Sequence, residues 1–337
     1  MDNLNNAKKD NFSRKTILVT GAAGFIGSRL IVELLREGHQ VIAALRNAAT
    51  KKDKLLGFIA TQGLADPSIS FVEYDLSRDF KLDSLLSDAQ TKIHVIYHLA
   101  ASFNWGISKA EAERTNIKSG LALIEWAATL KQLERFIWIG GYRVAAPPQE
   151  SADELYCKHG GYEASKILGH QAFIEACKRL NVPWTAINPA TVIDGFYNYG
   201  DMQCIGIADM IDKLYQGRLL ALPGGRDTFL PLCNMQYIVS FLIRTMSYPE
   251  TIAQEYMLLD PATPKFHRLV YLAAEHLGVS SPHLQIPKVL LEKLPEVLLD
   301  GSKEQLSFIS TEHYHVAGAE AMAAKMGITD LIRIMPY

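Results

Sequence analysis

A tyrosine and a lysine are the residues of this chain whose types and spacing most directly suggest chemistry. Tyr162 and Lys166 stand four positions apart in the stretch Tyr-Glu-Ala-Ser-Lys. In a helix, residues at i and i+4 project from one face, so the phenol and the ammonium would lie side by side. A free phenol has a pKa of about 10, and a nearby cation favours its phenolate. Such a pair can exchange a proton with a substrate oxygen, although the same spacing also arises by chance.

The elements around this pair are expected to form a parallel sheet. From Thr16 onward, short β-branched runs alternate with longer helical patterns, which is typical of βαβ units. Most of the runs are continuously apolar, as expected of strands covered on both faces. The predicted strands are Thr16–Thr20, Gln40–Leu45, Ile69–Tyr74, Ile93–His98, Arg135–Gly140 and Trp184–Asn188. The predicted helices between them are Phe25–Arg36, Lys81–Ala89, Ala110–Leu130 and Tyr162–Leu180.

The regular alternation ends near Pro189, and this change divides the chain. We expect residues 15–190 to form a Rossmann-type, doubly wound α/β domain that binds a dinucleotide. Residues 191–337 are expected to form a smaller C-terminal α/β part that binds the substrate. That part should include a strand at Glu255–Leu259 and helices at Ile205–Gln216, Met235–Met246 and Phe266–Leu277. Residues 1–14 are polar, without the apolar run of a secretory signal, and are expected to be a flexible tail.

A glycine-rich loop follows the first predicted strand and opens the first helix. In Thr-Gly-Ala-Ala-Gly-Phe-Ile-Gly, which runs from Thr20 to Gly27, three glycines recur at every third position. Gly21 would permit a tight turn, Gly24 would let a pyrophosphate approach the backbone, and Gly27 would let the helix pack against the sheet. The helix N-terminus would then face the anion. This context predicts a nucleotide-binding loop.

The spacing of these glycines resembles the extended short-chain dehydrogenase/reductase superfamily, of the NAD-dependent epimerase/dehydratase-like type. The resemblance continues in chain order through Asp75-Leu76, where the family contacts adenine, and through the stretch after His98, which lines the cofactor. It reaches a segment near the nicotinamide at Pro189. The cofactor-binding residues that the resemblance implies are Gly21, Ala23, Gly24, Phe25, Ile26, Gly27, Arg46, Asp75, Leu76, Leu99, Ala100, Ala101, Lys166, Pro189, Thr191 and Val192.

The same resemblance implies catalytic roles. Tyr162 would donate a proton to a carbonyl oxygen as the nicotinamide delivers hydride, Lys166 would also hold the nicotinamide ribose, and Asn116 would complete the catalytic set. The family's Ser or Thr after the fifth strand is missing, because its position falls on Gly140 or Gly141. Two interpretations follow: Tyr142, Ser102 or Asn104 supplies the missing donor, or the site is impaired or non-catalytic.

Cofactor choice can be argued from the end of the second strand. An acidic residue there would bind the ribose hydroxyls of NAD, but this chain has Ala-Leu-Arg-Asn. Arg46 can bind a 2′-phosphate in a bidentate manner, assisted by Lys51 and Lys52, which favours NADP over NAD. The alternative is that Arg46 is only a solvated loop charge.

Substrate residues are expected in loops that follow the strands. Phe103, Asn104 and Trp105 come after the fourth strand, and Phe196, Tyr197 and Tyr199 lie in the loop that enters the C-terminal part. These side chains would either line an apolar or aromatic pocket or pack between the two parts of the chain. The predicted substrate residues are Ser102, Asn104, Gly141, Tyr142 and Phe196.

Composition argues against several other classes of protein. The 337 residues are 48% hydrophobic and carry a formal net charge of -2, so nucleic acid is not expected as a partner. The four cysteines lack paired short spacings, which favours reduced thiols in the cytoplasm. No window approaches about 18 consecutive apolar residues, so no membrane span is expected.

The closest histidines, His313 and His315, lack partners at ligand spacing, so no metal site is predicted. Ser165 lacks the Gly-x-Ser-x-Gly elbow of a hydrolase.

The leading functional hypothesis is an NADP-dependent oxidoreductase that acts on a carbonyl of a small hydrophobic or aromatic substrate, namely an aldehyde, a ketone or an acyl thioester. Around Tyr162 and in Leu-Pro-Gly-Gly from Leu222, the chain looks most like thioester-reductase, fatty-acyl-reductase and dihydroflavonol-reductase members. A nucleotide-sugar epimerase with tightly bound NAD and a non-catalytic NADP sensor are the alternatives. By analogy with relatives that pair through the helices bearing Asn116 and Tyr162, a homodimer is expected.

Overall fold

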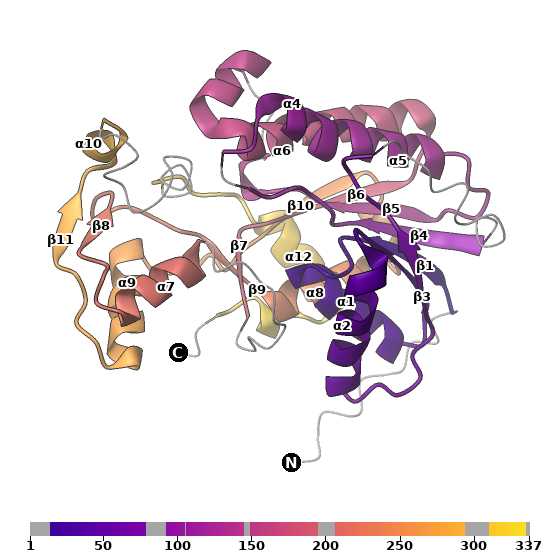
Figure 1. Ribbon diagram of the computed structural model, residues 1–337, viewed down its shortest axis with the longest axis horizontal. Helices are drawn as coiled ribbons and strands as arrows, with labels where there is room; N and C mark the ends of the chain where they lie inside the picture. The colour runs from indigo at the N-terminus through magenta and orange to yellow at the C-terminus, as the bar shows by residue number, and fades with distance from the viewer. Residues whose placement is uncertain are drawn as a thin grey trace.

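A seven-stranded parallel sheet forms the centre of the computed structural model (Figure 1), which describes residues 14–78, 92–104, 106–144, 149–194, 206–293 and 310–334. The strand order is β10-β6-β5-β4-β1-β2-β3. This order reverses direction between β1 and β4, as in doubly wound Rossmann folds. The strands are β1 (Thr16–Thr20), β2 (Gln40–Leu45), β3 (Ile69–Glu73), β4 (Ile93–His98), β5 (Arg135–Ile139), β6 (Trp184–Pro189) and β10 (Gln254–Leu258).

Helices cover both faces of this sheet (Figure 1). One face carries α4 (Lys109–Ala112), α5 (Ser119–Ala127) and α6 (Ala152–Leu180). The other carries α1 (Phe25–Arg36), α2 (Ala48–Thr61), α8 (Met235–Thr245) and α12 (Ala317–Met326). Because side chains alternate along a strand, Ile17 and Val19 of β1 enter one core and Leu18 enters the other. The continuous apolar runs in the sequence follow from these two cores.

The helices near Asn116 and Tyr162 are less regular than their sequence patterns predict. The helix expected over Ala110–Leu130 is divided into α4, a π-helical turn at Glu113–Lys118, and α5. Helix α6 begins with a capping box between Ser151 and Glu154, ten residues before the predicted start at Tyr162. It contains a break at Gly160, where φ is 78° and ψ is 177°. Irregular turns of this kind often occur at functional sites.

A smaller lobe lies beside the sheet, on the left of Figure 1. It contains α7 (Ile207–Tyr215), α9 (Phe266–Leu277), α10 (Lys288–Glu292) and the parallel pair β8 (Ala221–Pro223) and β11 (Leu284–Ile286). Its own apolar core includes Leu214, Leu222 and Phe266. A second short pair, β7 (Thr191–Ile193) and β9 (Leu232–Asn234), connects this lobe with the sheet.

The α/β fold class predicted from the sequence is confirmed, and the predicted strands agree with the observed ones to within one residue at their ends. Helix α2 was not predicted, and the predicted helix Lys81–Ala89 lies outside the described residues. The strand expected at Glu255–Leu259 is β10, which pairs with β6 in the main sheet. Segments after residue 190 therefore contribute to the Rossmann layers as well as to the smaller lobe. Across the described ranges, no helix is both long and apolar enough to cross a membrane.

Candidate cofactor and active site

The glycine loop between β1 and α1 has the shape that its spacing predicts. Gly21 has a positive φ of 68°, and a β carbon there would lie 2.8 Å from the backbone nitrogen of Ala100. A β carbon at Gly27 would lie 2.2 Å from the carbonyl oxygen of Gly21. The N–H of Gly24 donates to that same oxygen at 2.9 Å. Each glycine therefore stands where backbone approaches backbone, and no side chain caps α1. This backbone cradle at a helix N-terminus fits a dinucleotide pyrophosphate.

The ends of β1 and β4 are locked together beside this loop. Thr20 and His98 are opposite each other in register, and Thr20 Oγ1 contacts His98 Nδ1 at 2.8 Å. The N–H of Ala100 donates to Thr20 Oγ1 at 3.3 Å. Burial, with the nearby charge of Lys166, lowers the pKa of His98 to about 3, so its ring is neutral at physiological pH. The contact places Leu99 and Ala100 beside Gly21.

The end of β2 brings several charges together. Arg46 follows the strand and is exposed, and Asp75 lies two residues beyond the neighbouring β3. Partial burial raises the pKa of Asp75, but hydrogen bonds from Ser77 and the charges of Arg78 and Arg46 outweigh it and hold the pKa below its usual value. A residue that sequence reasoning missed, Glu73, accepts hydrogen bonds from the first backbone amides after Arg46. The parallel register of β2 and β3, in which Glu73 lies opposite Leu45, is the feature that points to Glu73.

Tyr162 lies just after the break at Gly160 in α6 and is held there by close packing. A β carbon at the preceding residue, Gly161, would lie 2.1 Å from the carbonyl oxygen of Ile107, so the helix meets the β4 loop there without a side chain between them. The ring of Tyr162 contacts the ring of Phe103 edge to face, with centroids 4.4 Å apart. Burial raises the pKa of Tyr162 above its usual value, and Glu163 adds to the shift. The described surroundings therefore favour the protonated phenol, in contrast to the phenolate that the sequence argument expected from Lys166.

Lys166 is anchored at the end of β5, one helical turn beyond Tyr162. Its Nζ donates to the carbonyl oxygen of Ile139 at 2.8 Å. Burial lowers the pKa of Lys166 to about 8, although Glu163 opposes this shift. The ammonium thus lies close to its titration at physiological pH, with its chain fixed against the sheet.

Asn116 lies in the π-helical turn and joins three segments of the chain. Its Nδ2 donates to Ser165 Oγ at 3.0 Å and to the carbonyl oxygen of Ser102 at 3.2 Å. Its Oδ1 accepts from the N–H of Ser102 at 2.7 Å. Ser165 Oγ in turn donates to the carbonyl oxygen of Tyr162 at 2.7 Å. These contacts use most of the amide's hydrogen-bonding capacity, and through Ser165 they tie the amide to the backbone of Tyr162.

The two glycines after β5 differ in the space around them. A β carbon at Gly140 would lie 2.0 Å from Asn188 Oδ1, an atom that is buried without a described hydrogen-bond partner. A β carbon at Gly141 would meet no atom within 4 Å. A side-chain hydroxyl would therefore fit at Gly141 and not at Gly140.

A buried ion pair lies behind Tyr162 and was not foreseen from the sequence. Arg143 Nε lies 3.7 Å from Glu163 Oε1, and both side chains are more than nine-tenths buried. Burial raises the pKa of Glu163, while Arg143 and Lys166 act in the opposite direction. Arg143 lies in the turn after β5 and Glu163 lies in α6, so no regular spacing in the sequence predicts that the two side chains pair.

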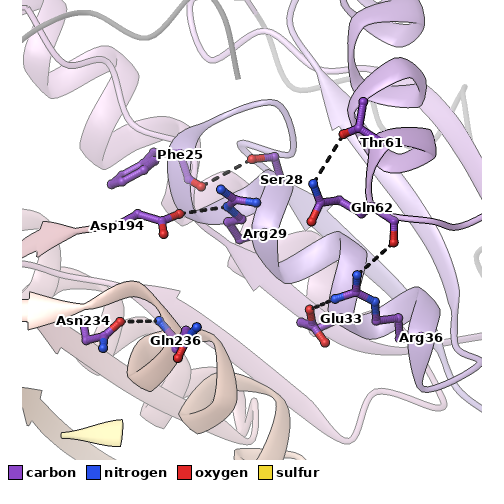
Figure 2. A network of polar contacts seen from close by, with 10 residues as sticks. All are labelled: Phe25, Ser28, Arg29, Glu33, Arg36, Thr61, Gln62, Asp194, Asn234 and Gln236. Atoms are coloured by element: carbon purple, nitrogen blue, oxygen red, sulfur yellow. Dashed lines mark hydrogen bonds and ion pairs between the residues drawn. The ribbon is translucent and has the colours of Figure 1, made fainter. Parts of the chain in front are cut away.

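Helix α1 is tied to the segment that leaves the sheet after β6. Figure 2 shows Arg29 of α1 pointing toward Asp194, and their Nε and Oδ2 atoms lie 2.9 Å apart. The preceding strand β7 contains Thr191 and Val192, and Pro189 ends β6. The N–H of Thr191 donates to the carbonyl oxygen of Pro231. The predicted cofactor residues of this segment therefore lie on an anchored part of the backbone.

Several predicted substrate residues lie outside the described residues. They are Phe196, Tyr197 and Tyr199, together with Trp105 and the side chain of Tyr142. Asn104 is exposed, and the backbone of Ser102 is bound to Asn116. His313 stacks on Phe229 with ring centroids 4.8 Å apart. Within the described part of the chain, no three His, Cys, Asp or Glu side chains group as metal ligands would.

Comparisons with known proteins agree with this arrangement. The model of the NAD dependent epimerase/dehydratase family matches residues 17–255. The chain belongs to this family. Its members bind nicotinamide dinucleotides, as the glycine cradle fits. A dihydroflavonol 4-reductase from Callistephus chinensis is 26% identical over 202 residues, which cover 55% of this chain and 54% of the relative. The chain spans about half the length of the curated dihydroflavonol reductases it matches.

Solved structures of similar fold include both reductases and epimerases. The terminal R domain from the myxalamid PKS-NRPS pathway has a TM-score of 0.67 at 22% identity, covering 88% of this chain and 78% of that one. A UDP-glucuronic acid 4-epimerase from Bacillus cereus in complex with NAD has a TM-score of 0.62 at 18% identity, covering 94% and 99%. At these identities the likeness concerns the fold alone.

Proposed function

We propose that this chain is an NADP-dependent reductase that transfers hydride to a carbonyl of a small, hydrophobic or aromatic substrate: an aldehyde, a ketone or an acyl thioester. The observation that carries the proposal is the placement of Tyr162 and Lys166 on one helical turn at the carboxyl ends of β4 and β5. The relatives named dihydroflavonol 4-reductase and the fold of the R domain support a reductive reaction. Arg46 supports NADP.

Four residues of the chain would have separate roles in the reduction: Tyr162, Lys166, Asn116 and Ser165. When bound, the nicotinamide supplies the hydride. Tyr162, which burial keeps protonated, donates its phenolic proton to the carbonyl oxygen as negative charge develops there. Lys166 holds a positive charge one turn away and stabilises the phenolate that remains. Asn116 and Ser165 fix the backbone of Tyr162, so that the hydroxyl keeps its direction. A panel of aldehydes, ketones and acyl thioesters, assayed by NADPH consumption, tests the proposal.

The rate of reduction is expected to fall as the pH rises through about 8. Lys166 is charged below its lowered pKa and neutral above it, so the stabilisation of the phenolate is lost on the alkaline side. In Lys166→Arg the cation persists at every accessible pH, and the residual rate should lack this decline. The measurement is kcat against pH with both variants. A wild-type profile that stays flat to about pH 10, where an unperturbed lysine titrates, would contradict the role of Lys166.

Restoring the missing hydroxyl should discriminate between the two glycines. Gly141→Ser enters open space, so we expect a free energy of unfolding within about 0.5 kcal/mol of wild type and a rise in kcat of about tenfold from the added donor. Gly140→Ser overlaps Asn188 Oδ1 and should lose about 2 kcal/mol of stability. Denaturant titration and the carbonyl panel measure both effects. Equal stability losses in the two variants would refute this account of the loop.

A nucleotide-sugar epimerase is the second candidate, because UDP-sugar epimerases with NAD are among the structures of similar fold. An epimerase keeps its cofactor through each turnover, so purified protein would carry NAD that co-elutes with the chain. A non-catalytic NADP sensor is the third candidate, motivated by Gly141. It predicts tight NADPH binding without consumption by any carbonyl of the panel.

A further inference from the structure

A carboxylate from β3 occupies the end of β2. Glu73 is the last residue of β3 and lies opposite Leu45 in the parallel register. Its Oε1 accepts a hydrogen bond from the N–H of Asn47 at 2.8 Å, and its Oε2 accepts one from the N–H of Ala48 at 2.7 Å. Each carboxylate oxygen therefore holds one amide at the start of the 14-residue helix α2. Charge-assisted bonds of this kind at a helix N-terminus are strong.

Glu73 provides the cap that the local sequence of α2 lacks. Asn47, the residue before the helix, is in the left-handed region with a φ of 59°, and its side chain makes no capping hydrogen bond. The first turn of α2 contains no acidic residue. An anion is therefore built into this position from the neighbouring strand.

The position is the one where Rossmann proteins distinguish their cofactors. An acidic side chain at the end of the second strand accepts the ribose hydroxyls of NAD, whereas an arginine accommodates the 2′-phosphate of NADP. This chain has both groups at that end: Arg46 on β2's own continuation and the Glu73 carboxylate beside it. The charge of Arg46 also acts on the carboxyl of Asp75, two residues beyond Glu73. The residues of β2 and its continuation include Arg46 but not the carboxylate of Glu73, which comes from β3.

We propose that Glu73 is a specificity-determining residue that limits the preference for NADPH and lets the chain accept NADH as well. The carboxylate repels a 2′-phosphate and already holds two amides that such a phosphate would bind. It can accept a hydrogen bond from a ribose hydroxyl without that repulsion. Arg46 and Glu73 thus act in opposite directions on one choice. This inference rests on the proposed dinucleotide-dependent function, and the dinucleotide site itself rests on the glycine cradle.

Equilibrium binding of NADPH and NADH tests the proposal without knowledge of the substrate. Dissociation constants are measured by fluorescence titration for the wild type and for Glu73→Gln, which keeps the size of the side chain and removes its charge. The ratio of Kd for NADH to Kd for NADPH is expected to rise about tenfold in Glu73→Gln. In Arg46→Gln the same ratio should fall below that of the wild type.

Two controls keep the test specific. Asp53→Asn removes an exposed carboxylate from α2, away from the two amides, and should leave the ratio unchanged. Glu73→Thr removes the charge with a residue suited to a strand end, and it replaces Glu73→Gln if that variant does not fold. A ratio within twofold of wild type in a folded Glu73 variant that binds dinucleotides would overturn the inference alone. A wild-type chain that binds neither dinucleotide would overturn the proposed function together with it.

Discussion

Tyr162→Phe is expected to lower kcat for every carbonyl that the chain reduces by at least about 1,000-fold. The substitution removes only the phenolic oxygen, so the ring keeps its edge-to-face contact with Phe103 at 4.4 Å. The Kd for NADPH should therefore stay within about threefold of wild type, well under the tenfold that corresponds to 1.4 kcal/mol. Steady-state kinetics and a fluorescence titration of the two proteins measure these quantities separately.

A second tyrosine of the same helix provides the matched control. Tyr156 lies in the first half of α6, and its hydroxyl is buried without a hydrogen-bond partner among the described residues. Tyr156→Phe should leave kcat and Kd unchanged, because no described contact depends on that oxygen. If Tyr162→Phe retained a rate close to that of Tyr156→Phe, the phenol of Tyr162 would not be the proton donor.

Gly27→Ala is expected to weaken dinucleotide binding by about 100-fold. The new methyl group would lie 2.2 Å from the carbonyl oxygen of Gly21, and this oxygen belongs to the backbone and cannot turn away as a side chain could. Relief of the overlap must move α1 away from the loop. The displaced backbone then fits the pyrophosphate less well, and a 100-fold rise in Kd corresponds to a loss of about 2.8 kcal/mol of binding free energy. Titration with NADPH and with NADH measures the loss, and both cofactors should be affected alike.

Gly57 offers a glycine of the same kind without the close approach. It lies within α2, and a β carbon there would meet no atom within 4 Å. Gly57→Ala should bind dinucleotides as the wild type does and gain up to about 1 kcal/mol of stability from helix propensity. Dinucleotide affinity in Gly27→Ala equal to that in Gly57→Ala would show that the loop does not hold the pyrophosphate.

Most of the fold could be predicted because its signals are local. Each element can be predicted from a few neighbouring residues, as the apolar runs at Thr16–Thr20 and Ile93–His98 and the glycine loop show. The pairing of β10 with β6 is different, since more than sixty residues, which include β7, α7, β8, β9 and α8, separate the two strands in the sequence. The local sequence of Gln254–Leu258 predicts a strand but does not indicate which other strand it pairs with. The same limit applies to the break at Gly160, which lies next to the close approach of Gly161 to Ile107.

The candidate site divides in the same way. The spacing of Tyr162 and Lys166 is a property of one helix, and the sequence therefore predicts their proximity. Two other features depend on which strands are neighbours in the sheet. Asn188 Oδ1 occupies the space that a side chain at Gly140 would need, and the carboxylate of Glu73 accepts hydrogen bonds at the start of α2. Burial raises the pKa of Tyr162 and Glu163 adds to the shift, whereas the sequence argument expected the lysine to lower it. Register thus added Glu73 to the candidate site, and burial changed the expected protonation of Tyr162.

Transfer of deuterium from labelled cofactor to product tests the central claim most directly. NADPH that carries two deuterium atoms at its hydride-donating carbon is incubated with the wild-type chain and each carbonyl of the panel, and the alcohol or aldehyde product is analysed by mass spectrometry. We expect product that gains one deuterium per hydride transferred with wild type and Tyr156→Phe, whereas Tyr162→Phe should form the labelled product at least about 1,000-fold more slowly. Tight binding of the labelled cofactor with no deuterium in any product would contradict this expectation.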